Sequence, residues 1–165
     1  MLLNKKKEVI GMSVSKLIDV AKESVGKDAQ GAADFFRVSK PIGNWCAWFV
    51  RMCGKEAGIS FGSSDEAKNV TAPYGVFKFV AGAAGTTKNK PRAGDVLFIQ
   101  PQNQNGISHV GICEEIVGGT IYSIEGNMSG SATQNSTVKR ASYSLDTGDG
   151  DTWGTIINFG ATTAI

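Results

Sequence analysis

The sequence predicts an α+β domain, with helices in the first half of the chain and an antiparallel β-sheet in the second. Apolar residues recur at helical spacing in the first half, whereas beyond Pro91 short apolar runs alternate with turn residues. The 165 residues are enough for one domain with a core of its own. The 21 glycines are about twice the average usage, which favours a fold with many turns. Helices followed by strands in one domain are typical of the α+β class.

The first helix is predicted from the spacing of apolar residues between Val14 and Val25. Ser13 or Ser15 is the expected N-cap, and Gly26 is the expected stop. One face of this helix is apolar, so we expect it to lie against the core.

Residues 26–43 are expected to form a loop-rich connector to a second, central helix. Asn44 is the expected N-cap of that helix, and Gly58 is its expected end. A third, shorter helix is expected around residues 73–80, with a proline in its first turn. The apolar stripe of the second helix contains Cys46, Phe49, Val50, Cys53 and Ala57.

Five strands are predicted, at residues 95–99, 108–117, 120–127, 138–143 and 155–159. The second and third of them meet across Gly118-Gly119, and two registers of this pair are possible. A two-residue turn would set apolar side chains beside Glu125 and Asn127. A three-residue bulged loop, which pairs residue 116 with residue 120, separates apolar from polar side chains instead.

In the bulged register, one face contains Val110, Ile112, Ile116, Tyr122 and Ile124, and the other contains His109, Gly111, Glu125 and Asn127. Burial of the apolar side chains favours this register, so we predict it. It brings Glu125 and Asn127 beside His109. A carboxylate there could fix the imidazole tautomer and stabilise the imidazolium.

Cys46 and His109 are the candidate nucleophile and base. A thiol attacks as its thiolate, and the unpaired N–H groups in the first turn of a helix favour that anion. Cys46 comes two residues after the expected cap Asn44, where this effect is large. His109 is the only histidine in the sequence, so no second residue of this type competes for the role of base.

Two kinds of metal site are weighed and set aside. A zinc site of three cysteines and His109 fails because its ligand pairs are about 10 Å apart on a helix and about 13 Å apart along a strand. The aspartates near residue 148 miss the spacing of a calcium loop, and we interpret them as a solvated turn. We therefore expect no metal and no cofactor. The residues in question are Cys46, Cys53, Cys113, Asp146, Asp149 and Asp151.

Four motifs resemble those of the CHAP family of cysteine amidases and peptidases, and they follow the order of that family. They are Trp45-Cys46-Ala47-Trp48-Phe49-Val50, Pro91-Arg92-Ala93-Gly94-Asp95-Val96-Leu97-Phe98, Ser108-His109-Val110-Gly111-Ile112 and Ile124-Glu125-Gly126-Asn127. The resemblance covers about residues 13–160 and implies a papain-like fold, with helices packed on the antiparallel sheet. Some members of the family have a loop of calcium-binding aspartates before the cysteine, but here that stretch contains only Asp34.

The resemblance also implies a role for each motif residue. Cys46 is expected to be the nucleophile, His109 the general base and Glu125 the residue that orients it. Asn127 matches a further polar residue of the site. We expect substrate contacts from Asn44, Trp45 and Trp48.

The implied activity is hydrolysis of an amide bond in bacterial peptidoglycan, either as an N-acetylmuramoyl-L-alanine amidase or as an endopeptidase. Two alternatives stay open. The domain could be a catalytically silent module that binds peptidoglycan, or a cysteine amidase that acts on an amide outside the cell wall.

Composition narrows the choice of partners. The net charge of +2 is much lower than is typical of a domain that binds nucleic acid. Lys5-Lys6-Lys7 is interpreted as part of a solvated tail. No apolar stretch approaches the about 20 residues that a membrane span needs. We therefore expect a monomer that binds peptidoglycan without nucleic acid or membrane insertion.

We expect an N-terminal tail at residues 1–12, a catalytic domain at 13–160 and a C-terminal tail at 161–165. The first 12 residues lack the order of a signal peptide, in which positive charge precedes a long apolar stretch. The enzyme is therefore expected to reach the wall after release or delivery from the cytoplasm, as a phage lysin or an effector does. A separate partner could provide the targeting.

Overall fold

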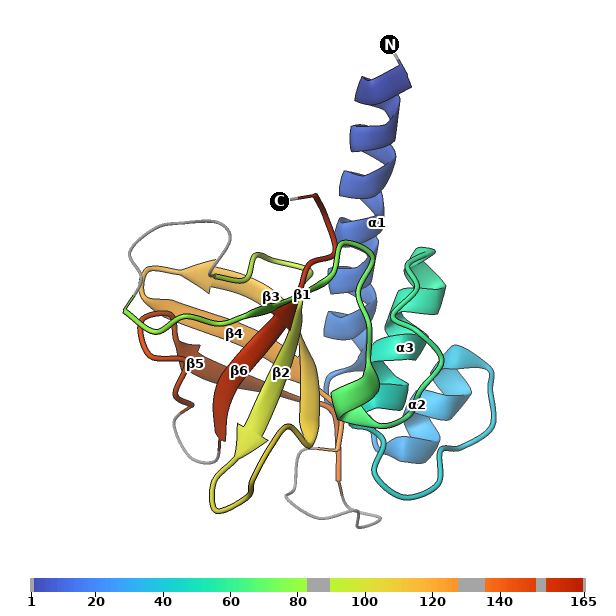
Figure 1. The fold of residues 1–165 in the computed structure, drawn as a ribbon. Helices are drawn as coiled ribbons and strands as arrows, with labels where there is room; N and C mark the ends of the chain where they lie inside the picture. Colours follow the sequence, from blue (N-terminus) through green and yellow to red (C-terminus); the bar gives the residue numbers. More distant parts are fainter. Residues whose placement is uncertain (1, 83–89, 128–135, 151–153, 165) are drawn as a thin grey trace.

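An antiparallel sheet forms one side of the molecule in this computed structural model, which describes residues 2–82, 90–127, 136–150 and 154–164 (Figure 1). Within the described residues its strands lie in the order β1-β6-β2-β3-β4-β5. The helices gather on one side of the sheet (Figure 1). The α+β class predicted from the sequence is thereby confirmed.

The helical elements are α1 (Leu2–Ser24), α2 (Ala29–Phe36), α3 (Cys46–Ala57) and the short 3-10 helix η1 (Ala67–Asn69). The strands are β1 (Val76–Lys78), β2 (Val96–Pro101), β3 (His109–Val117), β4 (Thr120–Glu125), β5 (Lys139–Ser144) and β6 (Gly154–Gly160).

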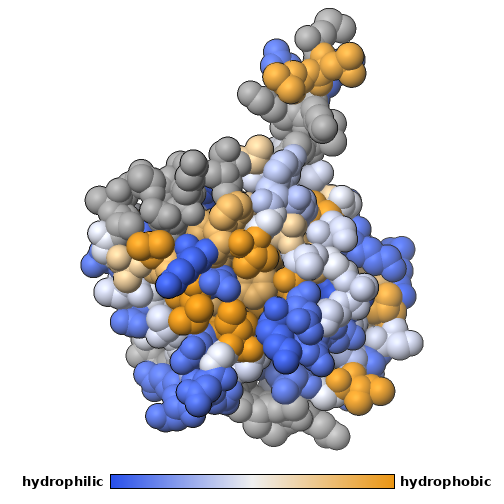
Figure 2. Space-filling view, in the orientation of Figure 1, coloured by the Kyte–Doolittle hydropathy of each residue, from blue (hydrophilic) through white to orange (hydrophobic). Residues whose placement is uncertain are grey.

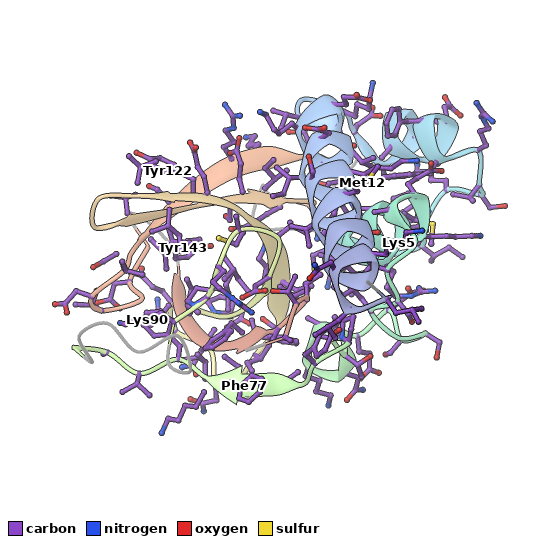
Figure 3. All side chains as sticks on the ribbon, turned by 90° about the horizontal axis from the view of Figure 1, so that it is seen from above. Lys5, Met12, Phe77, Lys90, Tyr122 and Tyr143 are labelled. Carbon is purple, nitrogen blue, oxygen red and sulfur yellow. The ribbon has the colours of Figure 1, made fainter. Side chains whose placement is uncertain are left out.

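Apolar clusters cover both faces of the sheet. The first cluster packs the helices against the outer face and includes Leu17 of α1, Phe49 of α3 and Ile124 of β4. The second cluster lies on the inner face, where the sheet curls, and includes Ile121 and Tyr143 (Figure 3). Burial of apolar surface on both faces is the main force that holds such a layered fold together.

Helix α1 is longer than the sequence analysis predicts. It begins at Leu2, so neither Ser13 nor Ser15 is its N-cap, and it ends at Ser24. Leucine and lysine in the added segment are good helix formers, which explains the extension. The N-terminal end of α1 projects from the body of the molecule and is partly apolar (Figure 2), with Leu2 88% exposed. No helix of the described residues has the length and apolarity that a bilayer span requires.

The predicted connector at residues 26–43 contains a helix, so this prediction is wrong. The side chain of Asp28 accepts a hydrogen bond of 2.7 Å from the N–H of Gly31 and caps α2. The helix ends at Arg37, which has a left-handed backbone with φ 58°. The helix buries Phe36 against Trp48, so tertiary packing stabilises a segment too short to be evident from its spacing.

The helix predicted around residues 73–80 is also wrong, because this segment contains strand β1. Val76 pairs with Gly160, and Lys78 pairs with Asn158, so β1 forms an edge strand beside β6. The partner lies about 80 residues away in the sequence, and a local pattern does not contain that information.

The five predicted strands are present as β2 to β6, and the hairpin β3–β4 combines both registers weighed above. At the turn, Val117 pairs with Thr120, so the predicted three-residue loop is wrong. A bulge between Cys113 and Glu115 then shifts the pairing by one residue. The intervening Glu114 is nearly buried and accepts a hydrogen bond from the guanidinium of Arg140.

Beyond the bulge the predicted register is correct. Ile112 lies opposite Ile124, and both belong to the outer cluster. Ile116 lies on the turn side of the bulge, so it packs with Ile121 in the inner cluster and does not share the face of Ile112. Near the start of β3 the polar face therefore forms as the sequence predicts.

The carboxylate of Asp95 links the start of β2 to the C-terminal segment through two hydrogen bonds. It is 1% exposed, and its two oxygens accept hydrogen bonds from the backbone N–H groups of Arg92, at 2.8 Å, and of Thr162, at 3.0 Å. Burial raises the pKa of this carboxyl above its usual 3.8 despite those two bonds and the nearby charge of Arg92. The side chain thus satisfies two N–H groups that would otherwise be unpaired.

We predict that Asp95→Ala lowers the free energy of unfolding by about 2–4 kcal/mol, because it leaves these two N–H groups without an acceptor. Urea denaturation followed by circular dichroism measures the change. Asp19→Ala, at an exposed position of α1, is the control and should change stability by less than about 0.5 kcal/mol. Equal stabilities of the two variants would contradict this role for Asp95.

Candidate active site

The first turn of α3 lies against the end of β4 because Gly126 has no side chain. A Cβ atom at Gly126 would lie 2.8 Å from the Cβ of Phe49 and 2.9 Å from the Cζ3 of Trp45. The indole N–H of Trp45 donates a hydrogen bond of 3.0 Å to the hydroxyl of Ser136, which fixes this ring. The close approach brings the start of the helix to the same place as the polar ends of β3 and β4.

His109 and Glu125 form a buried pair at this place. The Nε2 atom of His109 lies 2.7 Å from Oε1 of Glu125, and the two side chains are 7% and 0% exposed. Gly111 lies between them in the sheet, and a Cβ atom there would be 2.4 Å from the Cγ of Glu125. A glycine at this position is therefore what admits the carboxylate.

The second oxygen of Glu125 is also bonded. The hydroxyl of Tyr143 donates to Oε2 at 2.8 Å, and the hydroxyl of Ser123 donates to the same atom. Sequence analysis named neither residue. Ser123 precedes Glu125 by two positions on the same strand, so strand alternation was the available signal. Tyr143 could be found only from the pairing of β4 with β5.

Cys46 completes the constellation from the first position of α3. Its thiol forms a hydrogen bond with the ring of His109 and interacts with the backbone N–H groups of Val110 and Ala47. Because Nε2 of the ring faces Glu125, Nδ1 is the nitrogen left for the sulfur. The residue is 4% exposed. The structure thus brings together the thiol, the imidazole and the carboxylate that the sequence singled out.

The electrostatics of the pair favour charge separation. Burial opposes ionisation of Cys46, but the bond and charge of His109 outweigh it and lower the pKa of the thiol below its usual 9.0. Burial likewise opposes protonation of His109, yet its bonds with Cys46 and Glu125 raise the pKa of the imidazole to about 9. A thiolate beside an imidazolium is the state that these shifts favour.

The other two cysteines have the opposite environment. Cys53 and Cys113 are both 0% exposed, and each belongs to one of the two apolar clusters. Burial, together with the charge of Glu56, raises the pKa of the Cys53 thiol well above 9.0. Burial and nearby carboxylates also raise the pKa of the Cys113 thiol. A raised pKa keeps both thiols protonated at neutral pH, so neither supplies the thiolate that reacts.

Asn44 and Asn127 link the loop before α3 to the end of β4. The Nδ2 atom of Asn127 donates a hydrogen bond of 3.1 Å to Oδ1 of Asn44. Asn44 is exposed and is not the N-cap, because Trp45 holds that position without a capping hydrogen bond from its side chain. Asn127 has a left-handed backbone with φ 64°, and its buried Oδ1 has no hydrogen-bond partner among the described residues.

Trp45 and Trp48 lie in the core. They are 2% and 7% exposed, and their rings pack edge to face with each other. Trp48 also packs edge to face against Phe36 of α2. Of the three residues expected to contact substrate, only Asn44 presents its side chain to solvent. The two indoles hold the first turn of α3 in place.

The metal sites weighed above have no geometric counterpart in the part of the chain that the structure describes. There, no three side chains of His, Cys, Asp or Glu gather where they could hold a metal ion. Asp151 of the predicted turn lies outside the described residues.

Comparison with known proteins identifies the family. The model of the CHAP domain matches residues 38–127, which is more than half of the chain and includes Cys46, His109 and Glu125. The chain belongs to the CHAP domain family. This membership implies a hydrolase of the amidase or peptidase type with a function related to peptidoglycan. A search of curated proteins found no match.

We predict that Cys46 of this CHAP domain reacts with iodoacetamide at pH 7 well before Cys53 and Cys113. Because its thiol has a lowered pKa, its rate should rise less steeply from pH 7 to 9 than that of a free thiol, which gains about twentyfold. In His109→Ala the steep rise should return. Peptide mapping by mass spectrometry measures each site, and earlier labelling of Cys113 would contradict the assignment.

We predict that Gly111→Ala displaces Glu125 and lowers the alkylation rate of Cys46 at pH 7 toward that of a free thiol, because the added Cβ overlaps the Cγ of Glu125. Gly119→Ala is the matched control, since a Cβ there meets no atom within 4 Å. Thermal denaturation checks that both variants are folded. Equal reactivity of the two would show that Gly111 is not needed to admit the carboxylate.

Proposed function

We propose that this CHAP domain hydrolyses an amide bond in the peptide part of bacterial peptidoglycan through Cys46, His109 and Glu125. The observation that supports it is the buried chain of contacts from the Cys46 thiol through the imidazole of His109 to the carboxylate of Glu125. Family membership supports the class of substrate.

The first step is attack by the Cys46 sulfur on the carbonyl carbon of the scissile amide. Nδ1 of His109 holds the thiol proton, so the sulfur attacks as a thiolate and no free base is required. The carbonyl oxygen gains negative charge. The backbone N–H of Cys46, at the first position of α3, has no acceptor within the helix and is a donor that can stabilise this oxyanion.

The imidazolium of His109 next gives its proton to the leaving amine, and the C–N bond breaks to leave a thioester on Cys46. Water then attacks the thioester and its proton passes to the imidazole, so that the acid is released and the thiolate–imidazolium pair forms again. Glu125 stays paired with Nε2 throughout, so the ring keeps Nδ1 toward the sulfur.

Asn44 fits a substrate contact in this scheme, because it is exposed two positions before the nucleophile. Asn127 supports that contact. Its Nδ2 atom donates the hydrogen bond of 3.1 Å that holds the side chain of Asn44.

Digestion of purified sacculi tests the proposed function. Cys46→Ala and His109→Ala should each lower the rate at which amino groups are released by about a thousandfold or more, because each removes a reacting group. Glu125→Gln should cause a smaller loss, since packing still holds the ring. Cys53→Ala removes a buried thiol from the same helix and is the control.

The outcome that excludes the mechanism is near-normal digestion by His109→Ala. Mass spectrometry of the released fragments identifies the bond. A free lactyl group on the sugar indicates an N-acetylmuramoyl-L-alanine amidase, and a new peptide terminus indicates an endopeptidase.

A further inference from the structure

We propose that Tyr143 and Ser123 are positioning residues of this site, which hold the Glu125 carboxylate from the side away from His109. The proposal rests on the proposed function of the same site. Tyr143 lies beyond residues 38–127, so the part of the chain that matches the family does not include it.

Glu125 is fully buried and needs hydrogen bonds to both of its oxygens. Its side chain is 0% exposed, and an ionised carboxylate without hydrogen bonds is costly in such surroundings. Oε1 is bonded to Nε2 of His109, whereas Oε2 accepts from the hydroxyls of Tyr143 and Ser123. With the two hydroxyls removed, Oε2 would face the apolar inner cluster.

The sheet makes this arrangement rigid. Glu125 pairs with Lys139 and Ile121 pairs with Tyr143, so the Tyr143 ring starts four residues away and extends along the inner face to Oε2. It packs in the inner cluster and is 2% exposed (Figure 3). Ser123 lies between them on the same face of β4. Both hydroxyls are therefore held by strand register and by packing.

The orientation of the carboxylate sets that of the imidazole. A carboxylate can rotate about its last bond, and two donors on Oε2 stop this rotation with Oε1 directed at Nε2. The ring then keeps Nδ1 toward Cys46. His109 of β3 is bonded to Glu125, and Cys46 of α3 is bonded to the same ring, while Lys139 of β5, which pairs with Glu125, is exposed at the strand end.

Tyr143→Phe tests the proposal, because it removes one hydroxyl and keeps the ring. We expect about a tenfold lower rate of sacculus digestion and about a tenfold slower alkylation of Cys46 at pH 6–7. The acid limb of the alkylation profile should move to higher pH, because a carboxylate held less firmly stabilises the imidazolium of His109, and with it the Cys46 thiolate, less well. Tyr122→Phe, on the outer face of β4 and 36% exposed, is the matched control and should match the unaltered protein (Figure 3).

The NMR signals of the histidine ring distinguish a positioning role from a purely structural one. A hydroxyl that only stabilises the fold could be removed without changing these signals. The sequence has one histidine, so the resonances of the imidazole belong to His109 without further assignment. In Tyr143→Phe we expect the Nε2 proton to move upfield and to exchange faster with water, because the bond to Glu125 is loosened. Ser123→Ala should have the same effects, and it replaces Tyr143→Phe as the test if that variant does not fold.

The outcomes separate the two proposals. If both hydroxyl deletions leave the alkylation profile and the His109 resonances unchanged, the positioning roles are wrong even if the protein digests sacculi. If the shifts appear but the unaltered protein digests no sacculi, the proposed wall hydrolysis is wrong and the positioning roles remain.

Discussion

The buried carboxylate of Glu125 is the constraint on which the rest of this site depends. A negative charge at 0% exposure is stable only when its oxygens are hydrogen-bonded, and here the donors come from three neighbouring strands. His109 is the donor from β3, Ser123 from β4 and Tyr143 from β5. The geometry of the sheet and the chemistry of the imidazole are therefore linked through one side chain.

The two faces of the sheet have different roles: the outer face packs against the helices, and the inner face contains the buried carboxylate. The outer cluster fixes α3 against β3 and β4, and Gly126 sets how close the first turn of the helix comes to the strands. On the inner face, Tyr143 of the second cluster bonds to the carboxylate of Glu125, which is 0% exposed. The thiol and the imidazole meet at the start of β3, where Cys46 from the helical layer contacts His109 on the inner face. Close packing on both faces of the sheet fixes the positions of Cys46 and His109.

In the hairpin β3–β4, the pattern of apolar residues predicts the register near His109 but not the position of the bulge. The requirement that Val110 and Ile112 be buried predicts the register beside His109, and this register is observed. The same requirement does not say where the extra residue lies. It lies inside the strand at Glu114, where the bulge is accompanied by a bond to Arg140 of the next strand. The missed helix α2 and the missed strand β1 have the same cause, since each is stabilised by a partner distant in sequence.

The sequence by itself determined the class of fold and singled out Cys46, His109 and Glu125 as candidates for one site, because periodicity and residue type are local properties. It also determined the family, because the motifs follow one another in a recognisable order. Only the tertiary structure decided that Trp45 and Trp48 are core residues. It alone placed Tyr143 behind the carboxylate, since that contact depends on the alignment of β5 with β4. The physical reason is that burial and hydrogen bonding between distant segments are properties of the packed chain, and no short stretch of sequence contains them.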